Sequence, residues 1–213
     1  MQMPVPDPAI VDRRARIVAD LSGLLPADAV ISDTRELLDY ECDGLAAYRC
    51  PPLAVLLPRT TSEVAAALAC LHAARVPVVA RGAGTSLAGG ALPTADAVLV
   101  SLARMTRVLE VDLADRFIRV EAGRTNLSVT QAVEAQGFFY APDPSSQLAC
   151  AIGGNIAMNS GGAHCLKYGV TANNLLGVTL VQMDGTILPL GAPSMDAPGP
   201  DPVGVASGPE GQS

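Results

Sequence analysis

The chain has 213 residues, of which 49% are hydrophobic, so it is long enough to bury one sizeable core. Its 21 acidic residues outnumber 14 lysines and arginines, and the resulting formal charge of -7 argues against nucleic acid as a partner, because binding a phosphate backbone requires clustered cations. The chain has no tryptophan, 4 tyrosines and 3 phenylalanines, so stacking platforms for bases are missing as well. No run approaches the roughly 18 apolar residues of a membrane span, and we expect a folded protein without a transmembrane segment.

The cysteines indicate the compartment. They are odd in number, contain no CxxC pair and follow no recognisable disulfide spacing: Cys42, Cys50, Cys70, Cys150 and Cys165. This usage favours a reducing compartment, and we expect a cytoplasmic protein. Because His72 and His164 are the only histidines of the sequence, ligands for a zinc or iron-sulfur site are few, and no metal is expected.

The first half of the chain predicts a helical lead-in followed by an α/β unit. Apolar residues near helical spacing, such as Ile17 and Leu21, predict a helix in residues 1–47, and a second short helix is expected from about 34 to 41. The run LAVLL at 53–57 is bounded by prolines and predicts a buried strand. Thr60, Thr61 and Ser62 then offer hydroxyl caps, and Glu63 an early acidic residue, to an alanine-rich helix that leads into a strand at 78–80.

A glycine-rich loop follows that strand, from Arg81 to Pro93, with the sequence RGAGTSLAGGALP. Its position at the carboxyl end of a strand is typical of ligand sites in α/β sheets. Successive small residues allow backbone N–H groups to form a concave nest around phosphate oxygens without a lysine. The glycine spacing matches neither the dinucleotide fingerprint nor the Walker loop, so an ordinary turn remains an alternative for the loop alone. Arg81 has two interpretations, a ligand contact or a structural clamp on carbonyl groups.

The second half predicts further strands at 97–101 and 107–112, with another directly after Ala114 and Asp115. A helix is expected from Thr125 to Ala135, with Gly137 ending it. Residues 175–183 and 187–190 flank Asp184-Gly185 and predict a hairpin. Between these lies a second glycine-rich region, from Tyr140 to Gly169, whose composition suits neither a core element nor a linker. Residues 191–213 are dense in proline and glycine and predict a tail.

Three linked motifs carry a family resemblance: RGAGTSLAGGALP, APDPSS and IGGNIAMNSGGAHCLKYG. In this order and spacing they resemble the FAD-binding domain of vanillyl-alcohol oxidase-type (PCMH-type) flavoproteins, and most closely the glycolate oxidase and D-lactate dehydrogenase group. The likeness covers about residues 35–190, including YECDGLAAYR at 40–49. It implies an α+β fold, in which two α/β subdomains hold FAD between them. The implied division is a lead-in at 1–47, the FAD-binding domain at 48–190, and a tail at 191–213 where that domain is cut short and the substrate domain is absent.

The resemblance also implies cofactor contacts by position. The first loop would wrap the FAD pyrophosphate through Arg81, Gly82, Ala83, Gly84, Thr85, Ser86, Leu87, Gly89 and Gly90. The flavin end and the remaining cofactor wall would be formed by Pro142, Asp143, Ser146, Gly153, Gly154, Asn155, Asn159, Gly161, Gly162, Gly169 and Val178. Turn formation by Asp143, and helix capping by Asn155 and Asn159, remain the alternatives. Thr85 stands where some relatives link the flavin to a histidine, so FAD is expected to be non-covalent.

The implied reaction is hydride transfer to FAD from a small 2-hydroxy acid such as glycolate or D-lactate, giving the 2-oxo acid. The resemblance identifies no catalytic base in this chain, and a partner subunit or electron acceptor is implied. His164 reads as a hydrogen-bonded loop residue, because no partner carboxylate stands at a telling spacing. A non-catalytic FAD-binding or assembly subunit, or a remnant that needs a partner chain, is the alternative function. An FAD-dependent reductase of cell-wall sugar nucleotides is a weaker third one.

Overall fold

The structure is a computed structural model that describes residues 3–192, 203–204 and 207–208. The expected tail, including Pro202 and Pro209, therefore lies mostly outside the described residues. The chain divides into two compact units, Met1–Arg104 with Val181–Leu188 and Met105–Leu180 with Pro189–Ser213. Each unit contains helices and strands, which confirms the expected α+β class. Within the described part of the chain, no helix is long and apolar enough to cross a membrane.

A four-stranded sheet forms the centre of the first unit. Its strands follow the order β1-β2-β4-β3 and comprise β1 (Val30–Ile31), β2 (Ala54–Leu56), β3 (Val78–Arg81) and β4 (Val98–Ser101). Strands β2 and β3 both run parallel to β4, whereas β1 pairs with β2 in the antiparallel direction. All residues of β2 and β4 are buried, and all of them except Ser101 are apolar, as expected for central strands covered on both faces. The carboxyl end of β3 leads directly into the first glycine loop.

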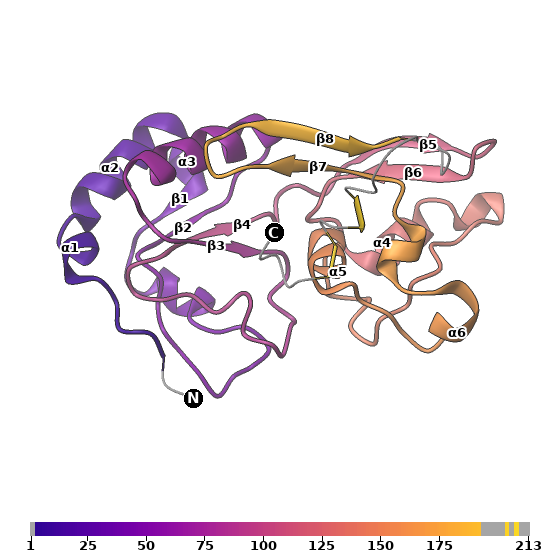
Figure 1. The fold of residues 1–213 in the computed structure, drawn as a ribbon, viewed down its shortest axis with the longest axis horizontal. Helices are drawn as coiled ribbons and strands as arrows, with labels where there is room; N and C mark the ends of the chain where they lie inside the picture. Colours follow the sequence, from indigo (N-terminus) through magenta and orange to yellow (C-terminus); the bar gives the residue numbers. More distant parts are fainter. Residues whose placement is uncertain (1–2, 193–202, 205–206, 209–213) are drawn as a thin grey trace. The chain divides into compact units, whose positions relative to one another are not determined.

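Three helices belong to the same unit: α1 (Pro8–Val11), α2 (Arg14–Leu24) and α3 (Thr61–Ala73). The expected lead-in helix is thus divided in two, and α2 packs beside α3 (Figure 1). Leu21 of α2 and Leu71 of α3 are both buried. The helix expected at 34–41 is a short 3-10 helix, η2 (Glu36–Tyr40), which follows another, η1 (Ala27–Ala29).

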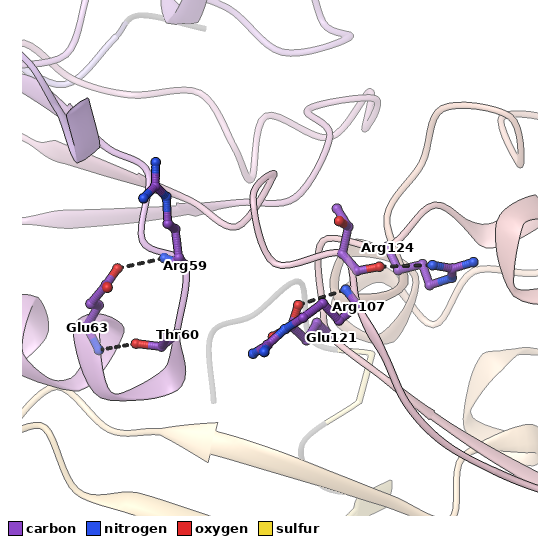
Figure 2. A network of polar contacts seen from close by, with 7 residues as sticks. Arg59, Thr60, Glu63, Arg107, Glu121 and Arg124 are labelled. Atoms are coloured by element: carbon purple, nitrogen blue, oxygen red, sulfur yellow. Dashed lines mark hydrogen bonds and ion pairs between the residues drawn. The ribbon is translucent and has the colours of Figure 1, made fainter. Parts of the chain in front are cut away.

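The start of α3 shows why the sequence begins a helix at that point. The Thr60 hydroxyl accepts a hydrogen bond from the Glu63 N–H at 3.1 Å, and the Glu63 carboxylate accepts one from the Arg59 N–H at 2.7 Å (Figure 2). Two N–H groups near the helix start are thereby satisfied by side chains. The predicted cap at Thr60 is confirmed.

The second unit contains an antiparallel hairpin and several short helices. The hairpin consists of β5 (Val108–Asp112) and β6 (Phe117–Val120), as expected (Figure 1). The helices are α4 (Asn126–Gln131), η3 (Glu134–Gln136), α5 (Ile152–Met158), α6 (Cys165–Tyr168) and η4 (Thr171–Asn174). The helix expected up to Ala135 ends earlier, and Thr125 occupies its N-cap position without a side-chain hydrogen bond. Gly137, at φ +80°, ends the separate helix η3 instead of the predicted helix.

The expected hairpin around Asp184-Gly185 is present as β7 (Gly177–Val181) and β8 (Ile187–Gly191). Its turn is closed by a hydrogen bond from the Gln182 N–H to the Thr186 carbonyl at 2.9 Å. Gly185 adopts φ +87° in this turn, a conformation that explains the glycine.

The expectation that residues 140–169 contain no core element is wrong. Helix α5 lies in this region, and Cys150, Ala151, Ile152 and Asn155 are buried. Its small residues allow close packing, because a Cβ on Gly153 would lie 3.0 Å from the Cβ of Ala122. A composition rich in glycine and asparagine here builds a tightly packed element.

Candidate functional site

The first glycine loop, residues 81–93, presents bare backbone. Gly84 and Gly89 adopt left-handed conformations, with φ of +68° and +81°. Within the described residues, no hydrogen bond is donated by the N–H groups of Ala83, Gly84, Thr85, Leu87, Gly89 and Gly90. A run of such donors in a loop with left-handed glycines is the arrangement that binds an anion through main-chain dipoles. The loop therefore offers a phosphate-type site at the carboxyl end of β3.

The side chain of Arg81 binds carbonyl groups of the chain itself. Its Nη1 donates hydrogen bonds to the carbonyl oxygens of Cys42, at 2.7 Å, and Tyr40, at 3.5 Å. Its guanidinium carbon also lies 5.8 Å from the centroid of the Tyr40 ring. A Cβ on Gly84 would lie 2.4 Å from Arg81 Nη2, so this contact requires glycine at 84. Of the two interpretations of Arg81, the structure supports the clamp on carbonyl groups.

In the second unit, Asp143 binds the turn that carries His164. The Asp143 carboxylate accepts a hydrogen bond from the His164 backbone N–H at 3.2 Å and pairs with His164 Nδ1. The hydrogen bond from His164 holds the pKa of Asp143 below its ordinary value. His164 is therefore a hydrogen-bonded loop residue, as expected, and its partner is a carboxylate 21 positions away that no local spacing signals.

Two buried amides form the centre of the same unit. Asn126 Nδ2 donates to Asn155 Oδ1 at 3.0 Å and to the Pro142 carbonyl at 3.1 Å. Asn155 Nδ2 in turn donates to Cys150 Sγ at 3.2 Å. Both asparagines are 2% exposed, so their amides hold the chain around Pro142 in place. Asn126 is not among the predicted site residues. It directly follows the predicted cap at Thr125, a position typical of an ordinary residue of the first helical turn.

Asn159 lies just beyond α5 in a left-handed conformation, with φ +47°, and its side-chain oxygen accepts a hydrogen bond from the Ala172 N–H at 2.9 Å. It caps the carboxyl end of the helix, in agreement with the alternative interpretation. Asn155 lies inside α5, and its role is the amide network rather than a cap.

The other residues of the predicted site in this unit divide by what surrounds them. A Cβ on Gly162 would lie 1.9 Å from the Asp143 carbonyl oxygen, and one on Gly161 would lie 2.3 Å from Cys165 Sγ. Gly154, by contrast, has no atom within 4 Å of such a Cβ. The remaining positions are a turn (Ser146), a left-handed glycine (Gly169) and strand β7 (Val178). Gly162 and Asp143 thus lie together, and Gly154 lies at an open surface.

The base of the β5–β6 hairpin is fixed by a buried carboxylate. Glu121 accepts hydrogen bonds from the backbone N–H, Nε and Nη2 of Arg107 at 2.7–3.0 Å (Figure 2). Burial alone would raise the pKa of Glu121, but the hydrogen bonds and charge of Arg107 outweigh it and hold that pKa below its ordinary value. Arg124 donates to the carbonyl oxygens of Thr106 and Ser128, at 3.0 and 2.8 Å. These contacts fix residues 121–124, and Ala122 in this segment packs against Gly153.

Each unit by itself offers bare backbone to a ligand. The first loop supplies main-chain donors, and Gly154 leaves room for close approach. Among the described residues, no group of three or more His, Cys, Asp or Glu side chains is placed to hold a metal ion.

Residues 52–191 match a family model described as an FAD binding domain. The chain belongs to this family of FAD-binding domains. FAD is accordingly its cofactor, and the free donors of the first loop fit the cofactor's diphosphate. The predicted resemblance is confirmed.

Known proteins support the same assignment. The FAD-binding chain is 48% identical over 201 residues to the glycolate oxidase subunit GlcD of Escherichia coli (strain K12), covering 94% of this chain and 40% of that protein. It is 34% identical over 155 residues to a D-lactate dehydrogenase of Anaerostipes hadrus, covering 72% and 32% of the two chains. The chain thus spans about two fifths or less of the length of these relatives.

Among solved structures, an alkyldihydroxyacetonephosphate synthase superposes on the FAD-binding chain with a TM-score of 0.81 at 20% identity, covering 99% of this chain and 39% of that one. At this identity the match shows the fold alone, and it confirms the expected fold class.

Proposed function

We propose that this chain is the FAD-binding part of an oxidoreductase that converts a small 2-hydroxy acid, such as glycolate or D-lactate, to the 2-oxo acid. The observation that carries the proposal is the 48% identity, over 94% of this chain, to a glycolate oxidase subunit. Glycolate and D-lactate, which the two relatives' names specify, share a hydroxyl group on the carbon next to a carboxylate. The proposal therefore names that class of substrate.

The roles of this chain's residues are binding and orientation. Bound FAD supplies the hydride acceptor. In the proposal, main-chain N–H groups of residues 81–90 bind the diphosphate, and residues 142–146 lie along the flavin end. The wall between them is assigned to Gly153, Gly154, Asn155, Asn159, Gly161, Gly162, Gly169 and Val178. The free donors of the first loop support the first of these assignments.

The contacts within the second unit give two of these positions an indirect role. The Asn155 amide binds Asn126 and Cys150, and Asn126 in turn donates to the Pro142 carbonyl. Asn155 therefore supports Pro142 through Asn126. The carboxylate of Asp143 is engaged by His164 and orders the turn at 162–164. Each holds the backbone that the cofactor would contact. No side chain of this chain is assigned as the proton acceptor of the reaction.

Non-covalent binding of FAD, a cytoplasmic location and a partner subunit belong to the same proposal. Thr85 offers no ring nitrogen for a covalent link, and all five cysteines are free thiols, which suits a reducing compartment. Residues 48–190 form the FAD-binding domain in this proposal, with a lead-in at 1–47 and a tail at 191–213.

A second candidate is a non-catalytic FAD-binding or assembly subunit that needs a partner chain. It is favoured by the description of the E. coli relative as a subunit. Copurification separates the two candidates, because this reading requires a partner before any substrate is oxidised.

The test of the proposed function is anaerobic reduction of the bound cofactor. The purified protein, with any copurifying subunit, is loaded with FAD and mixed with glycolate, D-lactate or L-lactate. We expect glycolate or D-lactate to bleach the visible flavin absorbance, with L-lactate as the control. Bleaching that appears only when a partner subunit is present would support the second candidate. Retention of FAD without bleaching by any 2-hydroxy acid, alone or with the partner, would contradict the proposed function.

A further inference from the structure

We infer that residues 40–45 are a structural support of the FAD site that sets the direction of the donors in the first glycine loop, and that Arg81 and Gly44 are its positioning residues. This inference rests on the proposed binding of the FAD diphosphate by that loop. All of the residues involved belong to the first unit. They lie about 40 positions apart in the sequence, and no motif connects them.

Arg81 makes the first of two attachments. Its guanidinium reaches from the end of β3 to the Cys42 carbonyl, at 2.7 Å, and lies over the Tyr40 ring. Arginine suits this position because its planar fork can donate to a carbonyl oxygen and stack on a ring at once. Gly84 passes directly over the guanidinium, since a Cβ there would lie 2.4–2.6 Å from its atoms. The start of the loop is thereby fixed on residues 40–42.

Gly44 makes the second attachment, further along the loop. A Cβ on Gly44 would lie 2.7 Å from the Ser86 carbonyl oxygen and 2.8 Å from that of Thr85. For Thr85, the carbonyl carbon is farther away, at 3.1 Å, so the oxygen is the nearer end of the carbonyl group. The carbonyl groups of residues 85 and 86 therefore face residue 44.

This contact determines where the loop's donors point. In a trans peptide unit, the N–H lies on the side opposite to the C=O, and the structure contains no cis peptide bond among its described residues. The Thr85 and Ser86 carbonyl groups face Gly44, so the N–H groups of Ser86 and Leu87 point to the opposite side. Residues 40–45 thus act as the back wall of the loop at residues 85–87, and the N–H groups of Ser86 and Leu87 face away from it.

Asp43 strengthens this wall. It is 5% exposed, and its Oδ1 accepts a hydrogen bond from the Leu45 N–H at 2.8 Å. This bond closes a tight turn that presents Gly44 to the loop. Leu45 continues the wall, because a Cβ on Gly89 would find its side chain at 3.8 Å. Contacts from residues 40–45 therefore reach Arg81, the middle of the loop and Gly89.

The experiment compares two pairs of variants in the purified chain, titrated with FAD at a temperature where each apo-protein is folded. Gly44→Ala inserts a methyl group against two carbonyl oxygens, whereas Gly23→Ala is the matched control because no atom lies within 4 Å of its Cβ. Arg81→Met removes the clamp, and Arg59→Met removes an exposed arginine that pairs with Asp28 instead. Arg81→Lys restores one donor without the planar fork.

We expect the FAD dissociation constant to rise about tenfold in Gly44→Ala and Arg81→Met, because misdirected donors lose at least one hydrogen bond to the charged diphosphate. The visible circular dichroism of saturated FAD should change in both, Arg81→Lys should recover part of the affinity, and both controls should bind as the wild type does. A merely structural role would lower the melting temperature and leave the dissociation constant of the folded protein unchanged.

The inference is overturned if folded Gly44→Ala or Arg81→Met binds FAD with wild-type affinity. Should Arg81→Met fail to fold, Gly44→Ala and Arg81→Lys decide the question. A wild-type chain that binds no FAD contradicts the proposed function itself, so the two failures are distinguishable.

Discussion

The two glycine-rich regions look alike in sequence and share both constraints on glycine, since Gly84 also packs against Arg81 and Gly169 is also left-handed, but they use their backbone groups differently. In residues 81–93, Gly84 and Gly89 adopt left-handed backbone, and several loop N–H groups have no acceptor among the described residues. In residues 140–169, Gly161 and Gly162 are required because side chains and carbonyl groups pack against them. The first region presents backbone N–H donors, whereas side-chain hydrogen bonds connect the residues of the second region to one another. The contrast teaches that glycine content alone does not distinguish a binding loop from a tightly packed one.

The largest expected effect follows from the packing of the second region. Gly162→Ala would place a Cβ 1.9 Å from the Asp143 carbonyl oxygen, and we expect it to destabilise the protein by about 3 kcal/mol in urea unfolding. Gly154→Ala is the control in the same region, because its Cβ has no neighbour within 4 Å, and the stability of its apo-protein should not fall. Equal stabilities for the two variants would break the comparison.

The next effect tests the internal hydrogen bonds of the second region. Asn155→Ala removes the acceptor for Asn126 Nδ2 and the donor to Cys150 Sγ, both in a buried site. We expect a loss of about 2 kcal/mol, the usual cost of leaving a buried polar group short of a partner. The control is Gln131→Ala, because Gln131 is exposed. Asn173→Ala is less suitable, because the Asn173 side chain accepts a hydrogen bond from the Val170 N–H. An unfolding free energy equal to that of the control would show that the amide network contributes nothing.

A smaller effect is expected in the first loop. Gly89→Ala has space for its methyl group, with the nearest atom at 3.8 Å, but must hold φ at +81°. The conformational cost is about 1 kcal/mol. Gly89→Asn should cost less, because asparagine tolerates the left-handed region better. A loss as large as that of Gly162→Ala would mean that Gly89 is limited by packing, as Gly84 is.

The smallest effect is a dependence on pH. The pKa of Asp143 is lowered by the hydrogen bond from His164, so the pair stabilises the fold above the unfolded pKa of an aspartate and loses this contribution as the pH falls through the folded value. The melting temperature of Asp143→Asn should therefore fall less than that of the wild type between neutral and acid pH. Asp115→Asn, at an exposed turn of the β5–β6 hairpin, should follow the wild type. Parallel curves for all three proteins would contradict the role of the pair.

Much of the fold could be predicted from the sequence because the signals are local. The buried runs of β2 and β4, the cap at Thr60 and the turn at Gly185 each depend on a few adjacent residues. Helix α5 was missed because glycine and asparagine are poor helix formers, and tertiary packing against Ala122 outweighs that preference.

The candidate site was predictable to a similar extent. The donor-rich loop after β3 follows from its glycines and from the preceding strand, and the resemblance supplied the cofactor. The clamp of Arg81 on residues 40–42, the Asp143–His164 pair and the amide pair of Asn126 and Asn155 join positions 21 to 41 residues apart. Contacts of that range depend on the folded chain, so no local pattern indicates them.

The central claim, that the first loop binds the FAD diphosphate through its backbone, is tested most directly by a pair of isosteric substitutions at Ala83. Ala83 is exposed and lies among the free donors, so Ala83→Asp adds a negative charge there and Ala83→Asn adds the same volume without it. The measurement is the FAD dissociation constant of both variants, from flavin fluorescence at low salt. We expect Ala83→Asp to bind FAD at least about tenfold more weakly than Ala83→Asn, because a carboxylate repels the diphosphate at close range. Equal affinities for the two variants would contradict it.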